Sequence, residues 1–455
     1  MKKREFLALG GALPLMMAGC GGNSSGSAQV RLLNATEGYT KVDLTVDNVS
    51  VTGGTGVAQD AISAYASVAA GTHTSTLSDV TSGSSLYLQS RTLTKDGKYT
   101  VVAYGFSGSA RTLQVFENQT APETGFGALS ILNTSVDIGI VDIYVTPTSD
   151  LTGQSPLLRS VSGPSQTAYT SVGQGTYTIT VTGTNKAGAD IRMVASGVTI
   201  ADQQILTLVL VPGPSGVLAK GLLLDNTAGT VTPYANPNMR VRIVGGVGDG
   251  RGVAMLANGG AIASSDATLT TSPSIGRYVV LPATTTLGVN VINADASVTP
   301  VPISDMELID GTITTTISLV AGTDYTLMVF GDPNNGVALK ARLVLDDNRR
   351  PSLAVNIKVR LVHLINNDSA DLTLQVNSIP VASNIHYGVA SPYAETAALA
   401  GQNSTILLTQ ALQPLYTLSQ GTQASNLYTM FAFQTPPTVA NPNPAPTPFF
   451  YGERQ

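Results

Sequence analysis

A phrase that recurs about 100 residues further along the chain constrains the fold more than any other sequence feature. Residues Ala64–Thr74 read AYASVAAGTHT, and residues Ala168–Thr178 read AYTSVGQGTYT. Diverged counterparts begin at Arg277 and at Ala397. Repeats of this length indicate tandem domains with separate cores rather than a solenoid of small repeats. The sequence therefore predicts four similar units.

Each unit has the pattern of β-structure. Residues Lys41–Asp47 (KVDLTVD) and Asp371–Asn377 (DLTLQVN) alternate polar and apolar side chains, which places one face of a strand in a core and the other in water. Valine, isoleucine, threonine and tyrosine fit this half-buried surface, and helical periodicity is almost absent beyond the N-terminus. Short strands at this spacing predict an all-β fold of tandem immunoglobulin-like antiparallel β-sandwich domains. A small barrel is the alternative that strand number alone leaves open.

The N-terminus carries a charged segment followed by an apolar one. Lys2–Arg4 precede the apolar stretch Phe6–Ala18, and the only cysteine of the chain, Cys20, follows two small residues. The stretch is shorter than the roughly 20 residues of a membrane-spanning helix and has the organisation of a signal peptide. A cysteine at this place resembles the lipobox of bacterial lipoproteins, although Met17 stands where leucine is usual. That resemblance implies cleavage before Cys20, lipidation of its thiol, and a membrane-anchored mature chain.

Other interpretations of this terminus stay open. An ordinary cleaved signal would make Cys20 incidental, and Lys3–Leu7 resembles a twin-arginine signal with one arginine replaced, so Sec and twin-arginine export are both considered. Gly21 occupies the position where aspartate often retains lipoproteins in the inner membrane. By resemblance, the expected location is the cell envelope, at the outer membrane or cell surface of a two-membrane bacterium.

The unit boundaries are marked by an aspartate or glutamate followed by asparagine, and by proline residues. The predicted organisation is a signal peptide at 1–19, a lipidated flexible tether at 20–28, β-sandwiches at 29–118, 127–226, 239–348 and 355–435, and a Pro-rich tail at 436–455. Connectors of about 8 to 13 residues predict a beaded rod with limited bending. The tail ends in Phe449–Tyr451, which either folds back on the last unit or docks on another chain.

Three phrases carry a resemblance to a known family. Val359–His363 with the following Ala370–Asn377, Val141–Val145 and Gly175–Thr178 resemble the repeats of an envelope domain family, domain of unknown function 4397. The resemblance covers residues 29–226 best, the fourth unit in part, and the third weakly. It implies a fold and an envelope location, and it supplies no activity.

Chemistry-bearing motifs are scarce. Once Cys20 is acylated the mature chain has no thiol, and none of its histidines, His73, His363 and His386, has the spacing of a metal site, so structural roles are expected for them. Asp346–Asn348 are the best oxygen ligands for calcium, with capped turns as the alternative. The net charge of −5 and the absence of a basic run exclude a nucleic-acid footprint.

These observations predict a protein without catalytic, cofactor or metal sites, whose one modified residue is Cys20. We expect a non-enzymatic, cell-envelope lipoprotein that acts as a structural or adhesion-like binding module. One alternative is a subunit of an envelope assembly that docks through its C-terminal tail or a strand edge. Another is a carbohydrate-binding protein that uses tyrosine platforms. The expected partners are the membrane, through the lipid on Cys20, and an envelope protein or polysaccharide.

Overall fold

The structure, a computed structural model, describes residues 26–186, 190–366, 370–399, 401–441 and 444–453. The predicted signal peptide and Cys20 lie outside these residues. Within these described ranges every regular element is a β-strand apart from two short 3-10 turns, and the prediction of an all-β sandwich protein is confirmed. None of the helical elements in the described ranges is long and apolar enough to span a bilayer.

The first unit contains two facing sheets with the strand orders β5-β1-β8-β9 and β3-β2-β6-β7, and β4 also pairs with β2. The bounds are β1 (Ser27–Glu37), β2 (Lys41–Val46), β3 (Val49–Ser50), β4 (Val57–Ala58), β5 (Ala66–Ala69), β6 (Gly71–Asp79), β7 (Ser85–Leu93), β8 (Lys98–Phe106) and β9 (Arg111–Phe116).

The second unit pairs its strands in the orders β13-β10-β17-β18-β19 and β12-β11-β15-β16, with β14 also on β10. The bounds are β10 (Phe126–Asn133), β11 (Val141–Thr146), β12 (Leu158–Val161), β13 (Ser165–Gln166), β14 (Thr170–Gly173), β15 (Gly175–Gly183), β16 (Ile191–Ile200), β17 (Ile205–Pro212), β18 (Ala219–Asp225) and β19 (Thr230–Tyr234).

The third unit has the orders β24-β20-β30-β31-β28-β29 and β22-β21-β26-β27, with β25 also on β20 and β23 also on β21. The bounds are β20 (Asn238–Val247), β21 (Arg251–Ala257), β22 (Gly260–Ala261), η2 (Ser265–Ala267), β23 (Thr268–Thr271), β24 (Ser274–Ile275), β25 (Val279–Pro282), β26 (Leu287–Ile292), β27 (Val298–Pro300), β28 (Ile303–Glu307), β29 (Ile313–Thr314), β30 (Asp324–Asp332), η3 (Pro333–Asn335) and β31 (Val337–Asp346).

The fourth unit has the orders β35-β32-β38-β39 and β34-β33-β36-β37. The bounds are β32 (Asn356–Leu364), β33 (Leu372–Val376), β34 (Ile379–Ile385), β35 (Ala394–Ala397), β36 (Asn403–Gln410), β37 (Gln413–Gly421), β38 (Leu427–Phe433) and β39 (Thr447–Gly452).

All four units follow one plan. The opening strand pairs in parallel with the later long strand of its own unit, in β1–β8, β10–β17, β20–β30 and β32–β38. Apart from β28–β31 of the third unit, the remaining described pairs between strands are antiparallel. The first core shows how the sequence positions these sheets. On β2, Val42, Leu44 and Val46 are buried while Lys41 points outward, as the alternation predicts.

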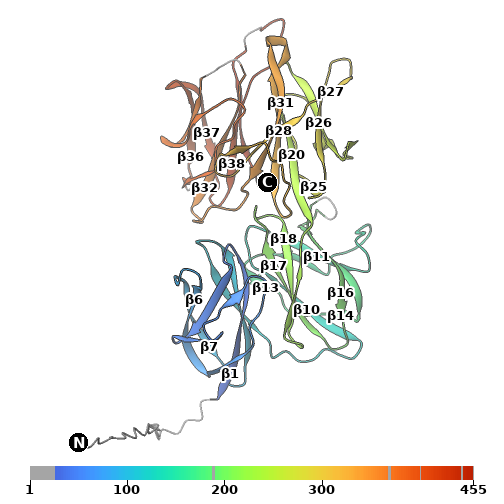
Figure 1. Cartoon of the computed structure of the whole chain (residues 1–455), viewed down its shortest axis with the longest axis vertical. Coiled ribbons are helices and arrows are strands. Elements are labelled where there is room, and N and C mark those ends of the chain that lie inside the picture. Colours follow the sequence, from blue (N-terminus) through green and yellow to red (C-terminus); the bar gives the residue numbers. More distant parts are fainter. Residues whose placement is uncertain (1–25, 187–189, 367–369, 400, 442–443, 454–455) are drawn as a thin grey trace, which may run out of the picture.

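The units pair face to face, and the predicted beaded rod is therefore wrong. The first and second units share a buried apolar cluster that includes Leu33, Val102 and Val209. The third and fourth share another that includes Met328 and Phe431. Figure 1 shows the first pair side by side in the lower half of the molecule and the second pair in the upper half.

The reason for this pairing is that the central strands carry apolar side chains on the outer face as well as on the inner one, beside a few buried threonine and aspartate side chains. All eight residues of β17, all nine of β30 and all seven of β38 are buried. A strand of an isolated sandwich would expose every second side chain to water. Here a neighbouring sandwich covers the outer face, and the burial of apolar surface favours a four-layer stack over separate beads.

Polar contacts join the two pairs. The Arg350 backbone N–H donates to Asp137 Oδ1 at 2.6 Å, and the Asp324 backbone N–H donates to Ser215 Oγ at 3.0 Å. The Arg349 guanidinium lies 5.0 Å from the centre of the Phe106 ring. These contacts hold the segments between units against the neighbouring pair.

Two boundaries differ from the sequence prediction. Residues 436–455 do not form a separate tail, because β39 within them pairs with β38 and completes a sheet of the fourth unit. The segment expected to connect the second and third units contains β19, which pairs with β18. The prolines of the last segment precede or begin β39, and β39 is an edge strand, where a missing backbone donor is tolerated.

Candidate functional site

The interface between the third and fourth units buries a reciprocal pair of ionic contacts. Arg242 of β20 donates through Nη1 to Glu453 Oε2 at 2.5 Å and through Nη2 to Glu453 Oε1 at 2.8 Å, and both side chains are 1% exposed. Arg360 of β32 lies with Nη1 2.7 Å from Asp346 Oδ1, and these side chains are 3% and 0% exposed. The arginine of each unit therefore pairs with the carboxylate of the other.

Hydroxyl groups complete each half of this cluster. Asp346 accepts from Thr326 Oγ1 at 2.6 Å and from Tyr278 Oη at 2.5 Å. Glu453 accepts from Thr429 Oγ1, and from Tyr393 Oη at 3.3 Å. We use the name interface charge cluster for the four charged residues and their four hydroxyl donors: Arg242, Arg360, Asp346, Glu453, Thr326, Tyr278, Thr429 and Tyr393. Its hydrogen bonds compensate for much of the desolvation of the four charges.

The strand register explains why the cluster recurs in the chain. Arg242 stands opposite Thr326 in the β20–β30 pair, and Arg360 stands opposite Thr429 in the β32–β38 pair. In each unit the tyrosine lies just before the strand that pairs antiparallel with the opening strand. The same backbone plan thus brings arginine, threonine and tyrosine together twice.

The first unit contains the same set. Arg31 lies opposite Thr100 and donates through Nη2 to Glu117 at 2.7 Å, and the Tyr65 hydroxyl donates to Glu117. Arg31 also reaches the second unit, where its Nη1 donates to the Gly229 carbonyl at 3.0 Å.

The second unit has an uncharged version. Ser130 faces Thr207 in the register, Tyr169 Oη lies 2.8 Å from Thr207 Oγ1, and Asn226 donates to Tyr169 at 2.9 Å. At the arginine position of the opening strands, the first pair of units therefore has one buried ion pair, whereas the second pair has two.

The charges of the cluster are compensated by one another and by hydrogen bonds. Burial by itself raises the pKa of Glu453, but the charges of Arg242 and Arg360 and the hydrogen bonds from Arg242 and Thr429 hold it below its ordinary value. Burial also raises the pKa of Tyr278 well above its usual range, so its phenol stays a donor. Charges compensated in this way fix the two units in one relative position.

A further carboxylate, Glu307, lies beside this cluster with poorer compensation. Both oxygens of Glu307 accept from the backbone N–H of Ala390 in the fourth unit, at 3.2 and 3.1 Å, and the residue is 1% exposed. Burial raises the pKa of Glu307 to about 7, against the opposing effects of the Ala390 N–H and the Arg342 and Arg360 charges.

Because of this carboxylate, we expect the unfolding free energy of the second pair of units to depend on pH. The pKa of Glu307 in the folded chain lies above its ordinary value of 4.5, so the folded chain binds more protons than the unfolded chain between these values. The associated stability is fully present below pH 4.5 and is lost as the pH rises through about 7. Glu307→Gln should remove this dependence, which amounts to about 3 kcal/mol. Denaturant unfolding at pH 5 and pH 8 measures the unfolding free energy of both proteins. An equal change in this free energy between the two pH values in both proteins would contradict the assignment.

The residues considered for calcium are engaged by protein donors. Asp347 lies 2.6 Å from Arg349 Nε and 3.0 Å from Lys358 Nζ. Asn348 donates to Asp324 at 2.7 Å, and Asp346 belongs to the interface charge cluster. Asp346 and Asp347 thus form buried ion pairs, which the calcium interpretation did not anticipate, and Asp347 Oδ1 also accepts from the Arg349 backbone N–H at 3.2 Å, as the capped-turn interpretation expects. Within the described residues, no group of three histidine, cysteine, aspartate or glutamate side chains is placed to hold a metal ion.

The three histidines lie apart from one another. His73 Nδ1 is 2.6 Å from Asp47, and its Nε2 is 2.7 Å from the Ala69 carbonyl, so both nitrogens face acceptors. The hydrogen bond to Asp47 accordingly raises the pKa of His73. His386 contacts Asp371 at the surface, and His363 is fully buried.

The tyrosines in these clusters do not form open platforms for sugar rings. The guanidinium carbons of Arg31, Arg242 and Arg360 lie 4.5, 4.8 and 4.6 Å from the ring centres of Tyr65, Tyr278 and Tyr393. Cations over the ring faces occupy the surface that a sugar would need. This observation concerns Tyr65, Tyr278 and Tyr393 only.

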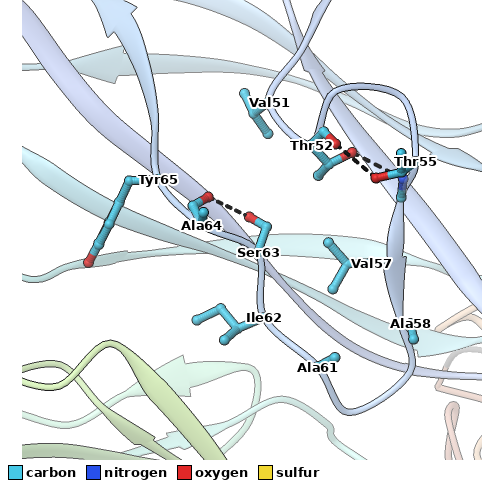
Figure 2. Close-up of a pocket in the computed structure, with 11 residues that line it drawn as sticks. Val51, Thr52, Thr55, Val57, Ala58, Ala61, Ile62, Ser63, Ala64 and Tyr65 are labelled. Atoms are coloured by element: carbon cyan, nitrogen blue, oxygen red, sulfur yellow. Dashed lines mark hydrogen bonds between the residues drawn. The ribbon is translucent and has the colours of Figure 1, made fainter.

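An open pocket of about 360 Å³ lies in the first unit, beside the β3–β4 segment. Figure 2 shows Val51, Val57 and Ile62 along it, with the hydroxyls of Thr52, Thr55 and Ser63. Thr55 Oγ1 donates to the Thr52 carbonyl at 3.0 Å, and Ser63 Oγ donates to the Ala64 carbonyl at 2.9 Å. No charged side chain is among its lining residues, and the hydroxyl of Tyr65, which does line it, donates to Glu117.

Comparison with solved structures finds distant neighbours. A candidate cell adhesion protein from Parabacteroides distasonis is 9% identical, with 49% of this chain and 99% of that chain covered and a TM-score of 0.24. A family CBM26 module of Eubacterium rectale Amy13K, solved with maltoheptaose, is 12% identical, with 40% and 91% covered and a TM-score of 0.14. A candidate cell adhesion protein from Bacteroides ovatus is 10% identical, with 48% and 97% covered and a TM-score of 0.12. No score reaches 0.5, so these neighbours carry no inference about this chain.

Comparison of sequences is more specific. No curated protein matches the chain. Residues 28–144 match the family described as "Domain of unknown function (DUF4397)". The match spans the first unit and the opening of the second, and ends in β11. The predicted resemblance is confirmed over these residues: this part of the chain is a DUF4397-like β-domain.

Proposed function

We propose that the chain is a non-enzymatic lipoprotein of the bacterial cell envelope, which displays two rigid pairs of β-sandwiches as a structural or binding module. The observation that carries the proposal is the signal-like N-terminus that ends in Cys20, only a few residues before β1 begins at Ser27. A tether this short holds the first pair close to the membrane.

The arrangement of the units supports display away from the anchor. β1 starts at the lower end of the block of sandwiches, and the third and fourth units form its upper end (Figure 1). The buried clusters between the units and the interface charge cluster resist bending within each pair. The second pair is therefore the part that we expect to meet partners.

Docking through a free C-terminal tail is not part of the proposal. The Phe450 ring stacks on Tyr428 with ring centres 4.9 Å apart, and Glu453 is buried in the interface charge cluster. Truncation after Thr435 would remove β39 and this carboxylate, so it would test the stability of the fourth unit rather than docking.

Membrane attachment is predicted to depend on one sulphur atom. Cys20→Ser should move the protein from the membrane fraction to the soluble fraction, because two or three acyl chains hold a protein stably at about 0.8 kcal/mol per buried CH₂. Fractionation and mass spectrometry of the N-terminal peptide measure this, with Ser24→Ala as the control. An unmodified thiol in an uncleaved chain would refute the proposal.

A further inference from the structure

The third unit has only a short form of an edge strand that is long in the other three units. In each of the other units, one sheet ends in a long edge strand that pairs along nearly the whole length of its neighbour. These edge strands are β7, which pairs with β6, β16, which pairs with β15, and β37, which pairs with β36. These covering strands are 9, 10 and 9 residues long. The corresponding strand of the third unit, β27, has only 3 residues and pairs with β26 only from Asn290 to Ile292.

Beyond the β27 pairing and the Val301–Val289 hydrogen bond, only the start of β26, Leu287 and Gly288, lies at a free edge. The Thr286 carbonyl accepts from the Asn258 N–H on the β21 side, whereas the Val289 carbonyl accepts from the Val301 N–H on the opposite side. Backbone groups of alternate residues in a strand point the same way. The N–H and C=O of Leu287 therefore point away from β21, toward the edge that β27 leaves open.

A groove of about 440 Å³ lies at this edge. It is lined by residues of four segments: Ala283 and Thr285–Leu287 just before and at the start of β26, Ile303 of β28, Ile317 and Leu319, and Leu343 of β31. No charged residue is among the lining residues. Residues 315–320, which contain Ile317 and Leu319, form no strand, although their sequence TTISLV alternates in the manner of one.

We propose that this groove binds an extended segment of another protein, which pairs antiparallel with the start of β26. The partner class follows from the three covered units, where the same edge carries an extended strand that packs on the core; the packed side chains of β16 and β37 are largely apolar, whereas β7 buries Arg91 as well as Leu93. On β16, for example, Met193, Ala195 and Val198 are buried in the core of the second unit. Main-chain hydrogen bonds to Leu287 and apolar side chains in the groove would hold the segment.

This inference rests on the proposed binding role and gives it a site in the pair of units farthest from the anchor. The uncharged groove favours a neutral, β-prone segment over an acidic or basic one. An open strand edge is otherwise a risk of aggregation, which proteins limit by covering or charging such edges.

The test uses the full chain and a labelled peptide, IRMVASGVTI, which copies β16. Fluorescence anisotropy should show saturable binding, and a scrambled peptide of the same composition without the alternation should bind at least about tenfold more weakly. Leu287→Lys places a charge at the edge and should reduce affinity at least about tenfold. Val298→Lys, a matched change at an exposed position of β27, should leave affinity unchanged.

Hydrogen exchange separates a lost site from a lost fold. Peptide binding should slow amide exchange within residues 283–289 of the unsubstituted chain, and protection elsewhere would overturn the proposal. Equal binding by the two lysine variants, or no binding by the unsubstituted chain, would overturn it as well. Because the acylation of Cys20 is measured independently, failure of the peptide test removes this site without touching the proposed anchor.

Discussion

Glu453→Ala is expected to destabilise the second pair of units by about 3 to 5 kcal/mol, because it leaves buried arginine charges without their partner. Arg242 loses both of its hydrogen bonds to carboxylate, and Arg360 loses a second negative charge 3.8 Å away. At about 2 to 4 °C per kcal/mol, the melting temperature of this pair should fall by about 10 °C. Calorimetry of the full chain measures the change.

Two controls separate charge burial from the loss of a side chain. Glu123→Ala removes an exposed carboxylate of the segment before β10 and should change stability by no more than about 0.5 kcal/mol. The double change Arg242→Met with Glu453→Leu removes both charges, and it should recover part of the lost stability. A single variant as stable as the unsubstituted chain would show that the ion pair does not hold the units together.

Phe431→Ala is expected to cost about 3 to 5 kcal/mol by leaving a cavity between the third and fourth units. Phe431 is 0% exposed, its ring centre lies 5.8 Å from that of Phe433, and the Arg242 guanidinium is 5.4 Å from it. Since this side chain belongs to the cluster shared by both units, the substitution should weaken the third unit as well as the fourth.

Hydrogen exchange resolved by unit measures this coupling. Protection should fall in β20 and β30 together with β32 and β38, whereas Phe126→Ala, at a position that is 42% exposed, should have a much smaller effect. Loss of protection in the fourth unit alone would contradict a shared core between the two units.

Local patterns predicted the strands because side-chain alternation and turn chemistry act over a few residues. The period of two in Lys41–Asp47 and Asp371–Asn377 placed strands that the structure contains as β2 and β33. The largely apolar runs Ile205–Leu210, Tyr325–Phe330 and Tyr428–Phe433 lie in β17, β30 and β38. Their lack of alternation was the available sign of a second covering layer.

The interface charge cluster could not be predicted, although its members are visible in the sequence. Asp346 was interpreted as a boundary mark and a candidate calcium ligand, and Glu453 as part of a polar tail. Arg242 and Glu453 are separated by 211 positions, and no local pattern links them. Only the stacking of two sandwiches brings them within hydrogen-bond distance and removes the water that would otherwise solvate them.

The sequence by itself determined the all-β class, the repeated plan of the units and the resemblance to DUF4397 that residues 28–144 bear out, because strand periodicity and repeated phrases are local properties. The tertiary structure alone decided that the units pair face to face, that residues after Thr447 complete the fourth unit, and that one edge of the third unit is covered only in part. These features depend on which faces and edges remain free once each sandwich has formed, a property of surfaces assembled from residues far apart in the chain.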